Sequence, residues 1–210
     1  MYPSTYSRRQ FALARIEAIN RRFDLTRESR TASGAVRHKC FVSYHSADTE
    51  EAATFVESFE DVFIPRAIGV EEGDGSIINS EDVDYIRDVI RTKYLKDSTV
   101  TIVLVGKCSW ARKFVDWEIY ASLRNTETTT RNGLLGILLP SLTQNPPTAP
   151  TRLVDNVPSG GGAAYGRYHY YPKTKSELRT NIEDAFHARG SRAHLIDNSR
   201  PLRKRNGTCS

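Results

Sequence analysis

The sequence lacks the features of a membrane, secreted or metal-binding protein. None of its apolar runs approaches the roughly 20 residues that cross a bilayer, and no apolar segment follows the first basic residues to form a signal peptide. Its three cysteines, Cys40, Cys108 and Cys209, are widely spaced, so we expect no disulfide framework. His38 and Cys40 together offer two metal ligands at best. We therefore expect a cytoplasmic protein with no metal site and no membrane contact.

The composition is that of an ordinary folded domain. The 210 residues are 39% hydrophobic and 26% charged, which argues against wholesale disorder, and the length suits one domain with appendages. The net charge of +5 is uneven, because residues 1–39 hold nine basic and three acidic side chains and residues 200–205 add four basic ones. A nucleic-acid reader more often carries its positive charge on the folded face. We therefore expect solvated basic ends and no nucleic-acid partner.

Strand-like and helix-like patterns alternate along the chain. Strands are predicted at 39–44, 62–68, 99–105, 134–139 and 165–171. Helices are predicted at 8–23, after Asp48, at 80–94, 114–123 and 176–189. The β-branched run 99–105 is typical of a central strand covered on both faces, whereas Pro65 places the second strand at an edge. Such alternation predicts an α/β fold, a flavodoxin-like open parallel sheet with helices on both faces.

The same patterns divide the chain into three parts. We expect an N-terminal amphipathic helix and linker at 1–37, the α/β domain at 38–192, and a flexible basic tail at 193–210. One face of the N-terminal helix is apolar through Phe11, Ile16, Ile19 and Phe23. That face would pack on the domain or on a partner. Within the domain, residues 143–162 are rich in Pro, Gly and Ser and predict a long loop.

The fold class predicts where a ligand binds. In an open parallel sheet the site lies beyond the carboxyl ends of the strands, where the strand order reverses, which here is beside the first and third predicted strands. The loop after the first strand contains Ser43, Tyr44, His45, Ser46 and Asp48. The loop after the third strand contains Gly106, Lys107, Cys108, Ser109 and Trp110.

Several segments resemble one known family. The first-strand run 39–45, Lys-Cys-Phe-Val-Ser-Tyr-His, followed by Asp48 resembles TIR domains. The third-strand run Val-Leu-Val-Gly-Lys-Cys-Ser-Trp at 103–110 and the helix run Val-Asp-Trp-Glu-Ile at 115–119 resemble the TIR-like family that includes the Thoeris antiphage TIR subunit. Residues 82–87 and 133–137 fit the same family. The likeness spans roughly residues 38–190, about one domain. It departs from the family at Phe114, where a second tryptophan is expected.

This resemblance implies an enzyme that consumes NAD⁺. TIR enzymes cleave the bond between nicotinamide and ribose. In defence systems of the Thoeris type the product is a signalling nucleotide, such as a cyclic ADP-ribose isomer, which activates a separate effector protein. The catalytic glutamate of the family matches Glu118. NAD⁺ is then a substrate and partner of the protein, and no further cofactor is expected.

A single carboxylate suits this reaction. Nicotinamide leaves as a neutral base, so no general acid is needed, whereas the developing oxocarbenium ion on the ribose needs negative charge nearby. Ordinary glycosidases usually need two carboxylates. A site that excludes water strengthens the electrostatic stabilisation. Beside Glu118, we expect substrate-binding roles for Phe41, Ser43, Tyr44, His45, Gly106, Lys107, Ser109, Trp110 and Trp117.

Plainer interpretations of these residues stay open. Glu118 could be a solvent-facing helix residue, and Lys107 a solvated one. The aromatic rings of Trp110 and Trp117 are more often part of a core than of a site. For the whole protein, the alternative is a catalytically silent TIR-like adaptor that acts by self-association, with the N-terminal helix as an assembly element. Release of nicotinamide by the purified protein would separate the enzyme from the adaptor.

Overall fold

The computed structural model describes residues 5–26, 34, 36–66, 82–95, 97–126, 129–143, 148–158 and 162–209. The strands are β1 (Lys39–Ser43), β2 (Ile64–Arg66), β3 (Val100–Val105), β4 (Gly133–Leu138) and β5 (Arg167–His169). The helices are α1 (Thr5–Thr26), α2 (Thr49–Ser58), α4 (Val83–Val89, continued by a π-turn at Ile90–Tyr94), α5 (Lys113–Ser122), α6 (Thr151–Asp155) and α7 (Lys175–Ser191). Short 3₁₀ turns occupy Ser46–Asp48, Ser109–Ala111 and Ala193–Leu195.

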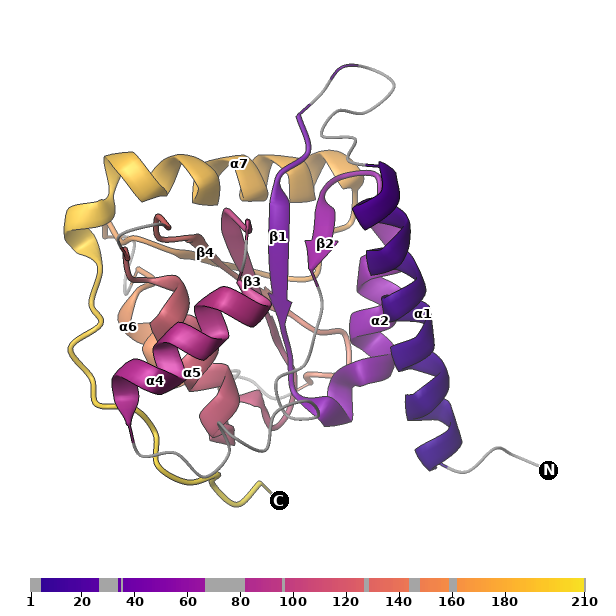
Figure 1. Ribbon diagram of the computed structural model, residues 1–210, viewed down its shortest axis with the longest axis horizontal. Helices are drawn as coiled ribbons and strands as arrows, with labels where there is room; N and C mark the ends of the chain where they lie inside the picture. The colour runs from indigo at the N-terminus through magenta and orange to yellow at the C-terminus, as the bar shows by residue number, and fades with distance from the viewer. Residues whose placement is uncertain are drawn as a thin grey trace.

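The strands form one parallel sheet in the order β2-β1-β3-β4-β5, with helices on both faces (Figure 1). This is the flavodoxin-like order, so the predicted fold class is confirmed. All six residues of β3 are buried between β1 and β4, as the β-branched run 99–105 predicted. Pro65 lies in β2 at the edge of the sheet, where a missing backbone N–H is tolerated.

Alternating side chains of β1 divide the core into two layers. Cys40 and Val42 pack in one cluster with residues of α1, α2 and α7, whereas Phe41 packs with residues of α4 and α5. The alternation follows from the two-residue period of a strand. Helix α2 therefore leaves β1 toward one face, and α5 leaves β3 toward the other. The strand order reverses between β1 and β3, which places the predicted crevice at their carboxyl ends.

The N-terminal helix packs on this core. Helix α1 lies beside α2 (Figure 1), and its Ala12, Ile16 and Ile19 belong to the same buried cluster as residues of the sheet. The prediction that Phe11 packs inward is wrong, because its side chain is 69% exposed. Ala12, one position further along the helix, is buried instead. The side chain of Phe23 lies outside the described residues.

Charged contacts accompany the apolar face of α1. Arg15 donates hydrogen bonds to Glu57 and, at 2.9 Å, to Glu50, both on α2. The hydrogen bond from Arg15 lowers the pKa of Glu57. Since partly exposed ion pairs contribute little net stability, the buried apolar side chains hold this helix. No described helix, the 22-residue α1 included, is long and apolar enough to cross a membrane.

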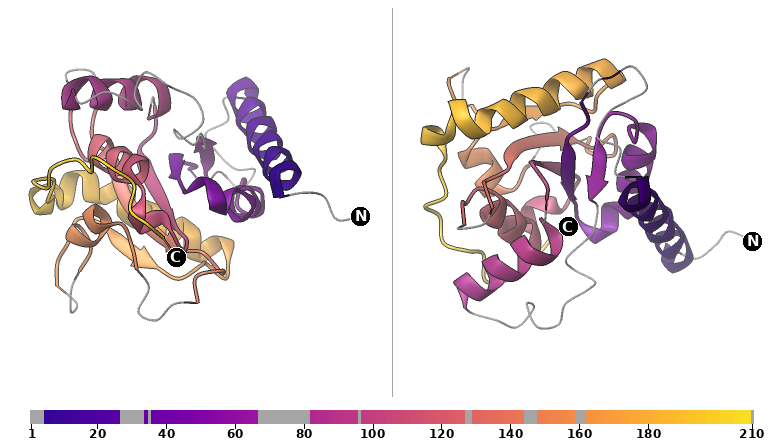
Figure 2. Two further views of the ribbon diagram at one scale, coloured as in Figure 1. Left: turned by 90° about the horizontal axis from the view of Figure 1, so that it is seen from below. Right: turned by 45° about the horizontal axis from the view of Figure 1, so that its top comes forward.

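The C-terminal segment also lies against the domain. Residues 193–209, the yellow trace in Figures 1 and 2, run past α6 and along α5. The backbone N–H of Arg203 donates to Asp116 at 2.9 Å, and the indole N–H of Trp117 donates to the carbonyl of Arg203 at 2.9 Å. The expectation of a loose tail is thus corrected. Its basic composition gave no signal of these backbone contacts.

A disulfide joins the end of this tail to the loop after β3. The Cα atoms of Cys108 and Cys209 are 5.6 Å apart, within the ordinary disulfide range. The pair corrects the prediction of no disulfide, which was also the argument for a reducing compartment. Its two members are separated by 101 positions. Cys40 stays free and buried, and burial raises the pKa of its thiol, so that it is a poor partner for thiol exchange.

The predicted loop at 143–162 contains helix α6. Arg152 and Leu153 of this short helix are buried, although the surrounding residues are rich in Pro and Gly. The side-chain amide of Asn156 donates to the carbonyl of Asp197 at 2.7 Å. The loop is therefore folded back onto the domain and the tail, at least in the part that the structure describes.

We expect Ile16→Ala to lower the free energy of unfolding by about 2–5 kcal/mol, because the change removes buried methyl groups and leaves a cavity between α1 and α2. Phe11→Ala on the exposed face is the matched control and should stay within about 0.5 kcal/mol of wild type. Urea unfolding followed by circular dichroism measures both. Equal, small effects would mean that α1 is a detachable addition and that deletion of residues 1–30 leaves the domain folded.

The disulfide gives a second expectation. Under oxidising conditions Cys209→Ser should lower the free energy of unfolding by about 2–4 kcal/mol, since the bond closes a long loop in the unfolded chain. With a dithiol reductant present, variant and wild type should unfold at the same denaturant concentration. Intact mass with and without reductant reports the bond itself. A wild-type protein equally stable in both conditions would contradict the contribution assigned to this disulfide.

Candidate functional site

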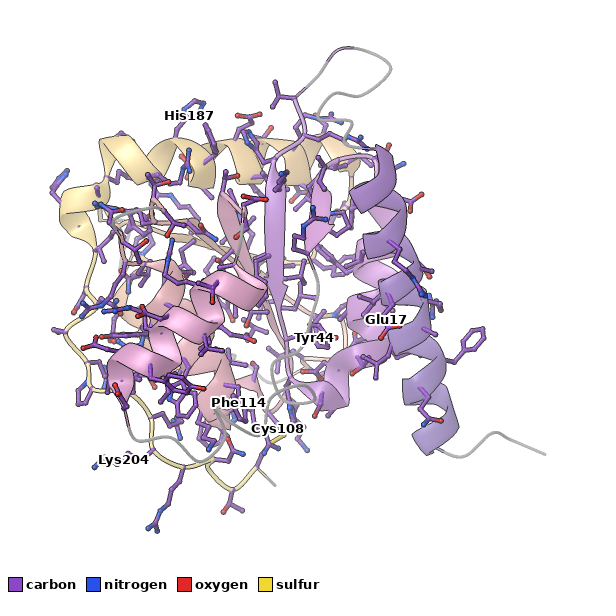
Figure 3. The ribbon with its side chains drawn as sticks, viewed as in Figure 1. Glu17, Tyr44, Cys108, Phe114, His187 and Lys204 are labelled. Carbon is purple, nitrogen blue, oxygen red and sulfur yellow. A yellow bond between two sulfur atoms is a disulfide. The ribbon has the colours of Figure 1, made fainter. Side chains whose placement is uncertain are left out.

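The candidate site lies at the carboxyl ends of β1 and β3. Ser43, the last residue of β1, pairs in register with Val103 of β3, and α5 crosses the face of the sheet beside them. Figure 3 labels Tyr44, Cys108 and Phe114, which all lie at the end of the molecule where the β1 arrow ends. The loops after β1 and β3, in which the sequence predicted the ligand site, therefore lie at the same edge of the sheet.

A hydrogen bond between sheet and helix is the centre of this site. The hydroxyl of Ser43 donates to Oε2 of Glu118 at 2.5 Å, and the two residues are 1% and 2% exposed. Ser43 faces α5 because it lies two positions after Phe41, on the same side of β1. Glu118 thus points toward the sheet and is not the solvent-facing residue of the plainer interpretation.

Burial of Glu118 is costly in free energy. A carboxylate withdrawn from water must be hydrogen-bonded to be tolerated, and buried ionic groups are weak contributors to stability even when they are paired. An apolar side chain would pack more favourably at this point of α5. Departures of this kind from ordinary packing rules are expected at functional sites, which makes Glu118 the strongest candidate residue of the fold.

Aromatic and apolar side chains form a cluster on the same face of the sheet as Ser43. Phe41 is fully buried in a cluster with Phe114, Trp117 and Ile86. The rings of Phe114 and Trp117 meet edge to face, with centroids 5.3 Å apart. Phe114 therefore keeps an aromatic ring at the position where the TIR-like family that the sequence resembles is expected to have a tryptophan. Apolar surroundings lower the local dielectric constant and strengthen the electrostatic effect of a nearby charge.

The two tryptophans lie in different surroundings. Trp117 is 3% exposed, and its indole N–H is bound to the carbonyl of Arg203 in the tail, so it is a core residue. Trp110 is half-buried and lines a cavity beside the tail. Neither indole is hydrogen-bonded to Ser43 or Glu118 within the described part of the chain. Their substrate-binding roles stay predictions.

Gly106 brings the two strand-end loops together. A Cβ atom at this position would overlap the carboxylate of Asp48, so glycine permits the loop after β1 to approach the loop after β3. His45 is buried, and its carbonyl accepts a hydrogen bond from the backbone N–H of Asp48 at 2.8 Å. The structure thus places His45, Asp48 and Gly106 close to the end of β1.

Three further predicted residues have ordinary structural surroundings. Tyr44 is buried within the core cluster on the α2 side of the sheet. Ser109 is buried, and its hydroxyl donates to the carbonyl of Gly106 at 3.1 Å, which stabilises the turn after β3. Lys107 is exposed. Of these three, only Lys107 has a side chain open to solvent and to a ligand.

A buried ion pair on the other side of α5 was missed from the sequence. Arg152 donates to both carboxylate oxygens of Asp116, at 2.9 and 3.3 Å, and Arg152 is 0% exposed. A further hydrogen bond of 3.1 Å joins Arg152 to the carbonyl of Pro201 in the tail. The pair links α5, α6 and the tail. Asp116 lies within the family-like run 115–119, but nothing in the local pattern indicates Arg152 as its partner.

We expect Arg152→Ala to lower the free energy of unfolding by about 3–5 kcal/mol, because it leaves the buried carboxylate of Asp116 without its counter-charge. Arg200→Ala is the control. Arg200 forms a partly exposed pair with Asp155, and its removal should cost about 1 kcal/mol or less. Denaturant unfolding of both variants gives the comparison. Similar small losses would mean that the Asp116–Arg152 pair is not the link assigned to it.

The comparison with protein families agrees with this geometry. A family profile described as "Thoeris protein ThsB, TIR-like domain" matches residues 41–144. The matched segment runs from β1 past the end of β4 and contains Ser43, Gly106 and Glu118. Helices α1, α6 and α7 and the tail lie outside it. A search among curated proteins gave no match.

Proposed function

The chain belongs to the TIR-like domain family of the Thoeris protein ThsB through residues 41–144, and on that premise we propose that it is an NAD⁺-consuming enzyme of antiphage defence. The reaction is cleavage of the bond between nicotinamide and ribose. The observation that supports this proposal is the buried carboxylate of Glu118, hydrogen-bonded to Ser43 beside the ends of β1 and β3. No other cofactor takes part, and NAD⁺ is the substrate.

Glu118 acts on the charge that develops during cleavage. When the bond breaks, its electron pair goes to the pyridine nitrogen, and nicotinamide leaves as a neutral molecule. The ribose carbon becomes oxocarbenium-like, and the negative carboxylate stabilises it. A hydroxyl or ring nitrogen of the same nucleotide, or water, then attacks that carbon and loses a proton. The proposal needs one fixed carboxylate rather than the pair used by ordinary glycosidases.

Ser43 is a positioning residue in this scheme. Its hydroxyl fixes one carboxylate oxygen of Glu118 from the end of a strand, and rigid elements hold a reacting group more accurately than loops do. We assign the exclusion of water from this carboxylate, which is 2% exposed, to the aromatic cluster of Phe41, Phe114 and Trp117 on the same face of the sheet. A preorganised charge in dry surroundings stabilises a transition state more than the same charge in water.

The remaining candidate residues receive different roles according to how exposed their side chains are. Lys107 is exposed in the loop after β3 and is the cation that we assign to the diphosphate of NAD⁺. His45 and Gly106 border the end of β1 and are assigned to the ribose side. Tyr44 and Ser109 support the loops from within. Trp110 faces the cavity on the tail side and is left out of the substrate site.

The product and its partner follow from the family alone. We assign a signalling nucleotide, a cyclic ADP-ribose isomer or a related ADP-ribose conjugate, which activates a separate effector protein. Exclusion of water favours capture of the ribose carbon by an internal group over hydrolysis. The burial of Glu118 supports that preference.

The alternative is a catalytically silent adaptor that acts by self-association. One observation favours it, since Phe11 is a large apolar side chain left 69% exposed on α1. A single exposed ring is also common on monomeric proteins. The two functions differ in whether the purified protein releases nicotinamide.

We expect Glu118→Gln to reduce NAD⁺ cleavage on the order of a thousandfold, because the change keeps the size of the side chain and removes its charge. Glu17→Gln on the outer face of α1 (Figure 3) removes the same charge from an exposed position and should leave activity unchanged. Ser43→Ala should give a smaller loss, since the carboxylate is retained. Nicotinamide and nucleotide products are followed by mass spectrometry, at matched melting temperatures.

Each outcome of this experiment has a definite consequence. The assay is run with and without extract from phage-infected cells, because a defence enzyme is expected to be silent before infection. Equal turnover by wild type and Glu118→Gln would remove Glu118 as the catalytic residue. No nicotinamide from wild type, even with the infected-cell extract, would favour the adaptor.

A further inference from the structure

A cavity lies between the domain and its C-terminal tail. Its volume is about 300 Å³, and its walls come from the loop after β3, the start of α5, the start of α6 and the tail. Three arginines contribute to these walls, together with Trp110 and Asp116. They are Arg112, Arg200 and Arg203.

This cavity is distinct from the site around Ser43 and Glu118. Asp116 lines the cavity, and Glu118 follows two positions later on α5. Two positions correspond to about 200° around a helix, so the two carboxylates point in nearly opposite directions. Their partners agree, because Asp116 binds Arg152 of α6, whereas Glu118 binds Ser43 of the sheet.

Some of the charged side chains that line the cavity have a counter-charge and others do not. The carboxylate of Asp116 is taken by Arg152, and Arg200 is bound by both carboxylate oxygens of Asp155 at 2.8 Å. Within the described ranges, the guanidinium groups of Arg112 and Arg203 form neither a hydrogen bond nor an ion pair. Two positive charges without a counter-charge therefore remain at the cavity.

The guanidinium of Arg112 lies at the start of α5 without a partner among the described residues. Its Nε atom is buried and makes no hydrogen bond to any described residue. The terminal nitrogens of the same guanidinium are not buried, so a ligand in the cavity would be held by them and not by the buried Nε. The planar guanidinium fork matches the oxygens of a phosphate. Trp110 adds an aromatic surface to the same cavity.

We propose that this cavity binds a small ligand that carries a phosphate monoester and a flat ring, of the size of one nucleotide. The two unmatched arginines would hold the phosphate, and Trp110 would contact the ring. A volume of about 300 Å³ is at the lower end for small-molecule pockets, which favours a mononucleotide over a dinucleotide such as NAD⁺. The proposal is independent of the reaction assigned to Glu118.

The tail is part of this binding site. Arg200, Pro201 and Arg203 lie outside the family-matched segment, and the tail is fastened by its contact to Trp117 and by the Cys108–Cys209 disulfide. A ligand that needs the docked tail also stabilises it, because anything that binds one state shifts the equilibrium toward that state. Reduction of the disulfide should therefore weaken ligand binding.

Calorimetric titration of the full-length, oxidised protein tests the proposal. The probes are AMP, inorganic phosphate and adenosine. We expect AMP to bind with one site per chain, phosphate to bind more weakly, and adenosine, which lacks the phosphate, to give no measurable binding. Arg203→Gln should weaken AMP binding at least about tenfold, and Arg112→Gln should do the same. The second variant also serves if the first does not fold.

Lys204→Gln is the matched control. Lys204 is the next residue of the tail and points into solvent (Figure 3), so that its removal changes net charge equally without touching the cavity. Its AMP affinity should equal that of wild type. AMP is also part of NAD⁺, but binding at the Ser43–Glu118 site would not respond to Arg203→Gln.

Three results would overturn the proposal. They are the absence of AMP binding, equal losses in Arg203→Gln and Lys204→Gln, and adenosine binding as tight as AMP binding. Phosphate binding as tight as AMP binding would overturn the assignment of a ring to Trp110. None of these results depends on NAD⁺ cleavage, so failure here and failure of the proposed enzyme function are separate observations.

Discussion

Helix α5 is buried along its length, and this burial determines where its two carboxylates find hydrogen-bond partners. Every residue of α5 from Phe114 to Ser122 is buried, although the segment contains two carboxylates. Asp116 and Glu118 point in nearly opposite directions, so no single neighbour can satisfy both. The sheet supplies Ser43 for Glu118, and α6 supplies Arg152 for Asp116.

Helix α6 and the tail, which both lie outside the family match, are organised around Asp116. Asp116 accepts hydrogen bonds from Arg152 and from the backbone N–H of Arg203. The side-chain carbonyl of Asn206 accepts a hydrogen bond from the backbone N–H of Lys113 in the first turn of α5 at 2.9 Å. The tail thereby satisfies one of the backbone donors that the start of a helix leaves open. Helix α5 and the tail are one structural unit.

The sequence predicts the sheet and its covering helices better than it predicts the long-range contacts that join distant segments. The buried run of β3, the edge position of Pro65 and the loops beside β1 follow from local patterns and from the rules of parallel sheets. The contact between Ser43 and Glu118 joins residues 75 positions apart, and the family resemblance was needed to single out the glutamate. The Cys108–Cys209 bond and the docking of the tail have no local signature, because a basic segment with free backbone groups resembles any solvated arm.

Strand, helix and tail make different contacts around the two carboxylates of α5, which determines which contacts change when a loop changes. Ser43 and Glu118 belong to elements whose positions are set by the buried sheet, so the carboxylate stays fixed when loops change. The tail contacts the opposite face of the same helix through Asp116. The two carboxylates of α5 therefore depend on different parts of the chain, Glu118 on the sheet and Asp116 on α6 and the tail.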